Sequence, residues 1–246
     1  MGVISNIYGV AARGLVTELA RHEVIANNVA NAHTAGFLRD TVVVNAAPPG
    51  TGAGGSGAAA LPWPEVAGTI VETQPGGVHR TDSPLDFAVS GDGYFVVETS
   101  EGRRLTRDGS FTFDSEGSLL TQAGQRVQGD GGAIQTTARS IEVTAQGELM
   151  GDGAPLDRLQ LLRPRAGTVL VKTAEGLLAP LNGDADLEPA DNVQVLQGYQ
   201  EDSSVNAVRE MVDMIGAFRA YEAGVRSIQA LDSAVGTAID RVGRLV

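Results

Sequence analysis

The sequence predicts an α+β protein with a long helix at each end of the chain and a β-rich domain between them. All ten prolines lie between Pro48 and Pro189, and because proline breaks helices, both ends of the chain are free to be helical. Apolar residues at the two ends recur at intervals of three and four, the period of one helical face. The stretch from Gly76 to Gly198 holds 18 of the 32 glycines among short apolar runs, a composition typical of strands and tight turns.

The first predicted element is a helix over about residues 3–30. At 1.5 Å per residue it would be roughly 42 Å long, and it would end between Asn31 and Gly36. An extended segment follows, so that residues 1–45 form the first predicted region. The apolar face of the helix is formed by Ile4, Tyr8, Ala11, Leu15, Leu19, His22, Ala26 and Val29.

A flexible loop is predicted next, over residues 46–65. Its first part, residues 46–60, contains only Ala, Gly, Pro, Ser and Thr. These small side chains cannot bury enough apolar surface to offset the entropy lost when the chain becomes ordered.

Residues 66–198 are predicted to form the central β-rich domain. Tight hairpins need residues with positive φ, and acidic residue–glycine pairs supply them; the pairs here are Asp92-Gly93, Asp108-Gly109, Glu116-Gly117 and Asp152-Gly153. Because the sheet needs neither terminal helix for its hydrogen bonds, we expect these residues to fold alone.

The last predicted region, residues 199–246, contains a C-terminal helix with Asn206 as its N-cap. A helix of about 39 residues would span roughly 58 Å, which is longer than a small β domain can cover. Its apolar stripe is formed by Val208, Met211, Ile215, Phe218, Val225, Ile228, Leu231, Val235, Ile239 and Val242.

Three interior glycines weaken this helix, since each costs about 0.5–1 kcal/mol relative to alanine. They are Gly216, Gly224 and Gly236. The helix would therefore be marginal alone, and we expect the two terminal helices to pack as a coiled-coil-like pair.

Composition excludes several classes of protein. The formal net charge is -12, the opposite of what a protein that binds the nucleic-acid backbone needs. The chain has no cysteine, which excludes disulfides, thiolate metal sites and a cysteine nucleophile. No run of 18 apolar residues occurs, and polar residues and glycines interrupt the N-terminal apolar stretch, so we expect neither a membrane-spanning segment nor a cleaved signal peptide.

Two nucleotide-binding patterns fail on their context. Gly50, Gly52 and Gly55 spell G-x-G-x-x-G, but two prolines shortly after them prevent the helix that would hold a pyrophosphate. Lys172 is the only lysine, and Val171 precedes it where a Walker A loop needs glycine. The sequence therefore predicts no nucleotide cofactor.

Metal and catalytic patterns are equally incomplete. The three histidines are scattered, and Ala26 stands where a zincin-like string starting at His22 needs its second histidine. Asp184, Asp186 and Glu188 resemble the start of a calcium loop, but a proline takes the place of its glycine, so we interpret them as a solvated acidic turn. Paired carboxylates for glycoside chemistry stay open, since their separation cannot be read from the sequence. We predict no catalytic residue, no metal site, no cofactor and no enzyme.

Three blocks of the sequence resemble the bacterial flagellar rod and hook protein family. They occur in the family's order and cover more than half of the chain. The first block is IANNVAN at residues 25–31, followed by Thr34, Gly36 and Phe37; the second is PLDFAVSGDGYF at 84–95 with TRDGSF at 106–111; the third is SVNAV at 204–208 with EMV at 210–212 and RAYE at 219–222.

This resemblance implies a structural axial subunit of the flagellar basal body. Such a subunit would be exported through the flagellar type III apparatus without cleavage, and it would polymerise through its terminal helices into the tubular drive shaft, the rod, that crosses the periplasm. Its partners would be copies of itself, other rod proteins and the export apparatus. The length and the segment RLQL at residues 158–161 look most like the proximal rod proteins. The alternatives are a distal rod subunit or a secreted, non-enzymatic β-domain binding module.

The resemblance, together with the apolar stripes, also implies an assembly interface. Asn27, Asn28 and Asn31 would satisfy polar partners where the first helix ends and packs, or would serve as ordinary C-cap residues. The predicted interface residues are Leu15, Leu19, Ile25, Asn27, Asn28, Val29, Asn31, Gly36, Phe37, Val208, Met211, Ile215, Phe218, Tyr221, Val225, Ile228, Leu231, Val235 and Ile239.

Overall fold

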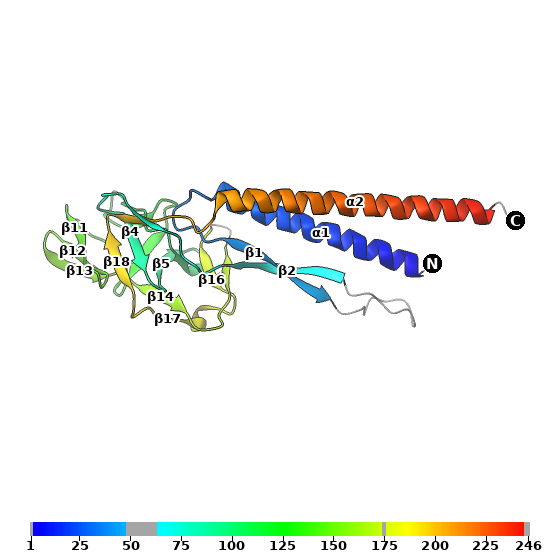
Figure 1. The fold of residues 1–246 in the computed structure, drawn as a ribbon. Coiled ribbons are helices and arrows are strands. Elements are labelled where there is room, and N and C mark those ends of the chain that lie inside the picture. Colours follow the sequence, from blue (N-terminus) through cyan, green and yellow to red (C-terminus); the bar gives the residue numbers. More distant parts are fainter. Residues whose placement is uncertain (1, 48–62, 174–175, 244–246) are drawn as a thin grey trace. The chain divides into compact units, whose positions relative to one another are not determined.

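The computed structural model describes residues 2–47, 63–173 and 176–243 (Figure 1). The chain divides into two compact units. The helical unit is formed by Met1–Val29, Asp40–Thr69 and Ala207–Val246, and the β unit by Ala30–Arg39 and Ile70–Asn206. The helical unit is therefore built from three separate stretches of chain.

The helical unit contains the two long helices that the sequence predicts. Helix α1 spans Gly2–Ala30, and α2 spans Ala207–Gly243 and begins directly after Asn206. The two helices run in opposite directions (Figure 1). A two-stranded sheet of β1 (Asp40–Ala47) and β2 (Trp63–Val71) forms the rest of this unit, apart from the end of β2. The predicted loop over residues 46–65 lies, except for its ends, outside the described residues.

The fold class is α+β, but the predicted coiled-coil-like pairing of the helices is wrong. The apolar residues in the first turns of α2 are exposed, and so is Leu19 of α1, which is 50% exposed. The reason lies in the spacing of the stripe. The two successive three-residue steps, from Val225 to Ile228 and from Ile228 to Leu231, together shift the stripe by roughly 120° around the helix. The stripe therefore winds around α2 and does not form the single seam that a coiled coil needs.

The β unit is built from short strands, as predicted for the centre of the chain. The largest sheet has the strand order β15-β16-β6-β5-β9-β8-β7, with β10 beside β9, and β14 joining β5 to β17. Its strands are β5 (Tyr94–Thr99), β6 (Gly102–Thr106), β7 (Phe111–Phe113), β8 (Leu119–Thr121), β9 (Arg126–Gly129), β10 (Gly132–Ala133), β14 (Leu161–Pro164), β15 (Leu170–Lys172), β16 (Leu178–Pro180) and β17 (Leu187–Pro189).

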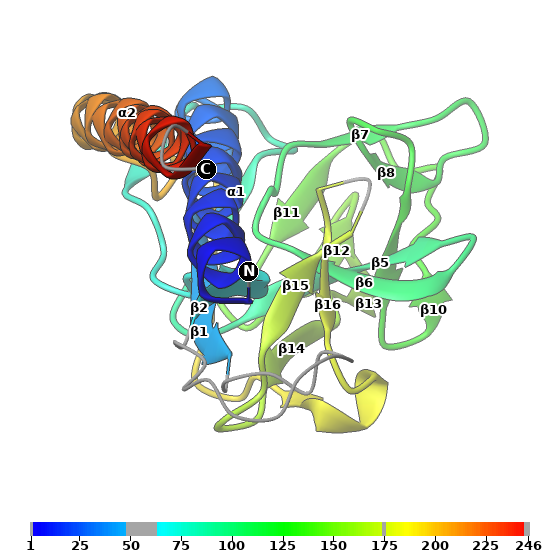
Figure 2. The same cartoon turned by 90° about the vertical axis from the view of Figure 1, so that its right-hand side faces the viewer.

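Three smaller sheets complete the β unit, and all of their strand pairs are antiparallel. Figure 2 shows several strands of this unit from a second direction. The smaller sheets pair β3 (Val78–Arg80) with β19 (Tyr199–Glu201), β4 (Phe87–Ser90) with β18 (Gln194–Gln197), and β11 (Ile141–Val143) with β12 (Glu148–Gly151) and β13 (Ala154–Arg158); a 3₁₀ turn, η1, spans Asp184–Asp186.

Two clusters of buried side chains form the core of the β unit. The larger cluster contains Phe111, whose ring meets Phe95 edge-on with the ring centroids 5.2 Å apart. The second cluster consists of Leu38, Val71, Tyr94, Val96, Leu105, Leu162, Leu170 and Leu178. Leu38 is 1% exposed, so the connector that follows α1 contributes a side chain to the core of the β unit.

The predicted turn glycines fall into two classes. Asp152 and Gly153 both have positive φ, of 50° and 82°, between β12 and β13, and Gly117 has a φ of 79°. Gly93 and Gly109 both lie in the described part of the chain, and neither has a positive φ. At Gly109 a Cβ would lie 1.8 Å from the backbone oxygen of Phe87, so this glycine is needed for close approach and not for a turn.

Candidate assembly surface

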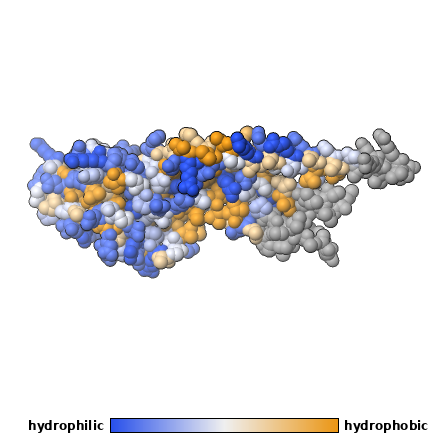
Figure 3. Space-filling view, in the orientation of Figure 1, coloured by the Kyte–Doolittle hydropathy of each residue, from blue (hydrophilic) through white to orange (hydrophobic). Residues whose placement is uncertain are grey.

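The first four turns of α2 carry an exposed apolar surface, which we call the outer patch. Val208 is 74% exposed and Phe218 is 53% exposed, although both are large apolar side chains. Figure 3 shows the hydrophobic colour gathered over this part of α2. The outer patch consists of Val208, Met211, Val212, Ile215, Phe218 and Tyr221. All but Val212 were predicted as interface residues. An exposed cluster of this kind marks an interaction site on a soluble protein.

The predicted residues of α1 divide between exposed and covered positions. Leu19 is exposed, as is its neighbour Val16 at 62%. Leu15 and Val29 are half-buried, and Ile25 is buried within the chain. The exposed pair therefore gives α1 a smaller apolar surface of its own.

Among the described side chains, the predicted apolar stripe is more covered in the second half of α2 than in the first. Val225, Ile228, Leu231 and Val235 are all half-buried, while the side chain of Ile239 lies outside the described residues. Near Gly224 the two helices approach closely, since a Cβ there would lie 2.6 Å from Cδ2 of Leu15. The predicted stripe thus combines an exposed part and a part that faces this chain's own residues.

Asn28 organises a buried polar network in the helical unit. Its Nδ2 donates to the backbone oxygen of Asp40 at 2.9 Å and to Oε2 of Glu210 at 3.2 Å. Its Oδ1 accepts from the backbone N–H of Asp40 at 3.0 Å. Asn28 is fully buried and Glu210 is 1% exposed. Of the two roles predicted for this asparagine, the structure shows the satisfaction of polar partners where α1 ends.

The other two predicted asparagines lie at the surface of the chain. Asn27 is exposed. Asn31 is half-buried, and its Oδ1 accepts a hydrogen bond from Oγ1 of Thr34 at 3.1 Å while its backbone oxygen accepts from the N–H of Thr34. Asn31 therefore shapes the turn that ends α1, in the manner of a C-cap residue.

Gly36 and Phe37 lie in the connector after α1 and contact residues of the β unit. Gly36 has a φ of 61°, and a Cβ there would lie 2.3 Å from the carbonyl carbon of Arg107, so no other residue fits. Nζ of Lys172 lies 3.3 Å from the ring centroid of Phe37 and donates to the backbone oxygen of Leu38 at 2.6 Å. Both predicted residues therefore have partners within this chain.

A buried ion pair lies beside this connector. Nη1 of Arg107 is 3.2 Å from Oε2 of Glu201, and each side chain is 1% exposed. Burial raises the pKa of the Glu201 carboxyl, and the Arg107 guanidinium opposes that shift. The guanidinium also lies 4.7 Å from the ring centroid of Tyr94. Neither charge reaches water, so each depends on the other.

The sequence predicts no role for Glu210, Arg107 or Glu201, although the first two lie within the segments that carry the family resemblance. Glu210 sits in the first turn of α2 and is buried, which is rare for a carboxylate. No spacing rule could have found its partner, because the two residues lie 182 positions apart. The same holds for the Arg107–Glu201 pair, at a separation of 94 positions.

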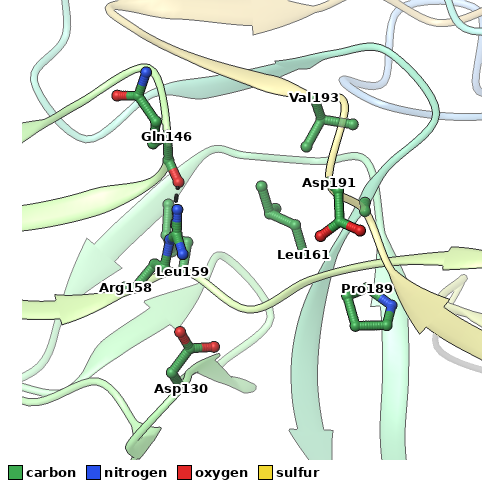
Figure 4. Close-up of a pocket in the computed structure, with 9 residues that line it drawn as sticks. Asp130, Gln146, Arg158, Leu159, Leu161, Pro189, Asp191 and Val193 are labelled. Carbon is green, nitrogen blue, oxygen red and sulfur yellow. Dashed lines mark hydrogen bonds between the residues drawn. The ribbon is translucent and has the colours of Figure 1, made fainter.

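The β unit has a shallow open hollow of about 260 Å³ (Figure 4). Its rim mixes charges of both signs, with Arg158 on one side and Asp191 on the other, and Nε of Arg158 donates to the backbone oxygen of Gln146 at 3.2 Å. The floor is apolar and includes Leu159 and Leu161. This mixture gives no ligand class an evident advantage.

The described residues offer neither a metal site nor a membrane-spanning helix. No three His, Asp or Glu side chains come close enough there to hold a metal ion. In the predicted acidic turn, Asp184 pairs with Arg103 at 3.4 Å and Glu188 with Arg163 at 2.8 Å. Neither described helix combines the length and apolar character that crossing a membrane would require.

Three family descriptions match the chain in consecutive order. "Flagella basal body rod protein" matches residues 9–37, "Flagellar hook protein FlgE/F/G D1 domain" matches 88–151, and "Flagellar basal body rod FlgEFG protein C-terminal" matches 196–241. The first match covers most of α1 and the connector, and the third covers nearly all of α2. Both therefore include the residues that surround Asn28 and Glu210.

Curated relatives match over nearly the whole chain. The flagellar basal-body rod protein FlgF of Mesorhizobium japonicum is 30% identical over 226 residues, which cover 91% of this chain and 92% of the relative. The FlgF protein of Caulobacter vibrioides is 29% identical over 226 residues with the same coverage. The flagellar basal-body rod protein FlgG of Agrobacterium fabrum is 31% identical over 256 residues, with 91% and 94% covered.

Proposed function

Because the chain belongs to the family of flagellar basal-body rod proteins, a family of structural proteins, we propose that it is an axial subunit of the rod and has no enzymatic activity. It polymerises through its terminal segments, residues 1–45 and 199–246, into the tube that crosses the periplasm. The partners are copies of this chain and other rod proteins. Export through the flagellar type III apparatus, without cleavage of a signal peptide, accounts for delivery.

The outer patch is the observation that carries this proposal. Its six apolar side chains are exposed in the single chain, and burying one of them contributes about 1.5–3 kcal/mol. A head-to-tail contact that repeats by a screw operation builds an open tube, and each added subunit covers the patch of its neighbour. We propose that the predicted residues with exposed or half-buried side chains, such as Leu19 of α1, take part in the same assembly, whereas Ile25 and Asn28, which are buried, support it from within the chain.

Ile215→Glu tests the role of the outer patch. Ile215 is 56% exposed, so the monomer should keep its melting temperature, whereas an interface would have to bury a carboxylate without a partner. We expect the variant to be produced and exported normally, to be missing from isolated basal bodies, and to leave cells non-motile.

Ser227→Glu is the matched control, since it adds the same charge at an exposed position of α2 outside the outer patch. It should assemble like the wild-type chain. Normal incorporation of Ile215→Glu would exclude the outer patch from the interface. Ile228, the midpoint of the predicted stripe, is half-buried and therefore a poorer probe, because its substitution would also disturb the monomer.

The position of the subunit within the rod is a separate proposal. We assign the chain to the proximal rod on its length and the single modest β unit, with the distal rod as the alternative. The relatives named FlgF match at 29% and 30% identity and the relative named FlgG at 31%. Sequence identity therefore does not favour one of these two kinds of relative over the other. Electron microscopy of basal bodies with this chain labelled would locate it, and density at the distal end would overturn the proximal assignment.

A further inference from the structure

Glu201, the last residue of β19, joins three other segments of the β unit. Its backbone oxygen accepts from the N–H of Gly36 at 2.9 Å. Its Oε1 accepts from the N–H of Gly76 at 3.4 Å, and its Oε2 accepts from Nη1 of Arg107 at 3.2 Å. The connector after α1, the segment before β3 and the loop after β6 therefore meet at one residue.

Arg107 is fixed from several directions at once. Besides its bond with Glu201, Nη1 donates to the backbone oxygen of Val89 at 3.2 Å, and Nη2 donates to that of Gly91 at 2.8 Å. The guanidinium also lies over the ring of Tyr94. These directional contacts allow the Arg107 side chain a single arrangement, and Glu201 has to follow it.

The two connectors leading to the terminal helices are paired beside this ion pair. Gly36 donates to the backbone oxygen of Glu201, and the N–H of Ser204 donates to the backbone oxygen of Phe37 at 2.9 Å. The N–H of Arg39 donates to Oγ of Ser204, also at 2.9 Å. Residues 36–39 and 201–204 thus leave the β unit as two segments joined by hydrogen bonds.

A buried ion pair is an unusual choice for stability alone. Taking two charges out of water costs about as much as their attraction returns, and apolar replacements of both partners are often as stable or more stable. The neighbouring core is apolar and would accept such replacements, since Tyr94 and Val89 are both nearly fully buried. The ion pair instead adds specificity of geometry, because it permits only one alignment of the loop after β6, which carries Arg107, with the end of β19, which carries Glu201.

We propose that Arg107 and Glu201 are positioning residues, which fix the alignment of the two connectors as they leave the β unit and do not raise the stability of that unit. The inference rests on the proposed rod function only for its consequence in cells. There, the alignment keeps residues 36–39 and 201–204, which belong to the two proposed assembly segments, paired with each other.

The test in solution uses the purified full chain and the variants Arg107→Met, Glu201→Leu and the double variant. Each single substitution leaves a buried charge or polar group without its partner, so the melting temperature of the β unit should fall. The double variant should melt above both single variants because it removes both charges, although it also leaves the backbone oxygens of Val89 and Gly91 and the N–H of Gly76 without these side-chain partners. Its amides of Gly36 and Ser204 should nevertheless exchange hydrogen at least ~10-fold faster than in the wild-type chain, because the connectors can open locally.

Two further variants make the result specific. Glu201→Gln keeps an acceptor for Arg107 and should retain slow exchange at Gly36 and Ser204. Arg163→Met combined with Glu188→Leu removes a partly exposed ion pair and should change neither the melt nor these amides. The inference is overturned if the double variant melts below both single variants or fails to fold, and equally if its two amides exchange at the wild-type rate.

In cells, the double variant should enter basal bodies in smaller amounts than the wild-type chain although its β unit is stable. Equal incorporation of the two would contradict the inference and leave the proposed function intact. Absence of the wild-type chain itself from basal bodies would contradict the proposed function, while the exchange measurement would still decide the inference.

Discussion

Asn28 donates a hydrogen bond from Nδ2 to Oε2 of Glu210 at 3.2 Å, although the two residues lie 182 positions apart in the sequence. Both side chains are shielded from water, with exposed fractions of 0% and 1%. The same asparagine donates a hydrogen bond to the backbone oxygen of Asp40 and accepts one from its backbone N–H. One side chain therefore ties α1 to β1 and to α2.

Asn28→Asp should destabilise the helical unit by about 3–5 kcal/mol at neutral pH, as expected when a buried charge has no partner. The substitution removes the donor and places a second carboxylate against Glu210. Protonation relieves this repulsion, so the loss should shrink at acidic pH and grow as the pH rises. Thermal melts followed by helical circular dichroism measure it. Asn27→Asp, at an exposed position, is the control, and equal melts for the two variants at neutral pH would refute the prediction.

Gly216→Ala and Gly224→Ala should have different effects although both glycines lie inside α2. A Cβ at Gly216 meets no atom within 4 Å, so alanine should stabilise the helix by about 0.5–1 kcal/mol. At Gly224 the Cβ would lie 2.6 Å from Cδ2 of Leu15, so this side chain has to move and the gain should vanish. The unfolding midpoint of the helical signal checks both. Equal stabilisation by the two substitutions would show that Leu15 and Gly224 are not in close contact.

Asp114 should make the stability of the β unit depend on pH in the acidic range. The N–H groups of Ser118 and Glu116 each donate to its Oδ1 at 2.8 Å, and these bonds, that of Ser118 first, lower the pKa of the carboxyl from its ordinary value of 3.8. A lowered folded-state pKa means that the stabilisation is complete above the unfolded pKa and is lost as the pH falls through the folded one.

Asp114→Asn keeps an acceptor oxygen but does not titrate, so it should flatten this part of the acid-stability profile. Urea unfolding at a series of acidic pH values provides the measurement. Asp191→Asn, at the rim of the hollow, is the control. An unchanged profile in Asp114→Asn would show that the loss of stability in acid arises elsewhere.

The fragment 66–198 should melt well below the β unit of the full chain. It lacks Leu38, which fills the second core cluster, and it lacks Glu201, so the buried Arg107 loses the carboxylate that compensates its charge. The second loss alone should cost about 3–5 kcal/mol. Melts of the fragment and of the full chain, followed by β-type circular dichroism, compare the two. A fragment as stable as the full chain would mean that the connectors add nothing to the core.

The existence and approximate bounds of both long helices could be predicted from the sequence, because three-four spacing over many turns is a strong local signal. The β-rich centre could be predicted from glycine and proline punctuation. The pairing of the helices could not be predicted in this way. The apolar stripe of α2 drifts around the helix, and this drift is not visible when the residues are only listed in sequence order. Summing the rotation from Val208 to Leu231 would have revealed it.

The predicted interface shows a similar limit. Val208, Met211, Ile215 and Phe218 of the outer patch were predicted from spacing, and their exposure fits a role between subunits. Gly36 and Phe37 belong to the same family motif as other predicted interface residues. Their contacts nevertheless lie within the chain, since Phe37 contacts Lys172 and Gly36 lies against Arg107. A motif indicates that a residue is important for the family. Whether its partner lies in the same chain or in a neighbouring subunit depends on contacts between residues far apart in sequence, which the motif does not show.

The helical unit is assembled from stretches at opposite ends of the chain, and this imposes an order in time. At synthesis rates of about 5–20 residues per second, roughly 10–40 s pass between the appearance of Asn28 and that of Glu210. During this interval α1 has none of its contacts with α2, whereas every residue of the β unit, which ends at Asn206, has been made by the time Glu210 appears. The part of the protein made first is therefore among the last to fold, and a chain released before Glu210 would carry a β unit and no helical unit.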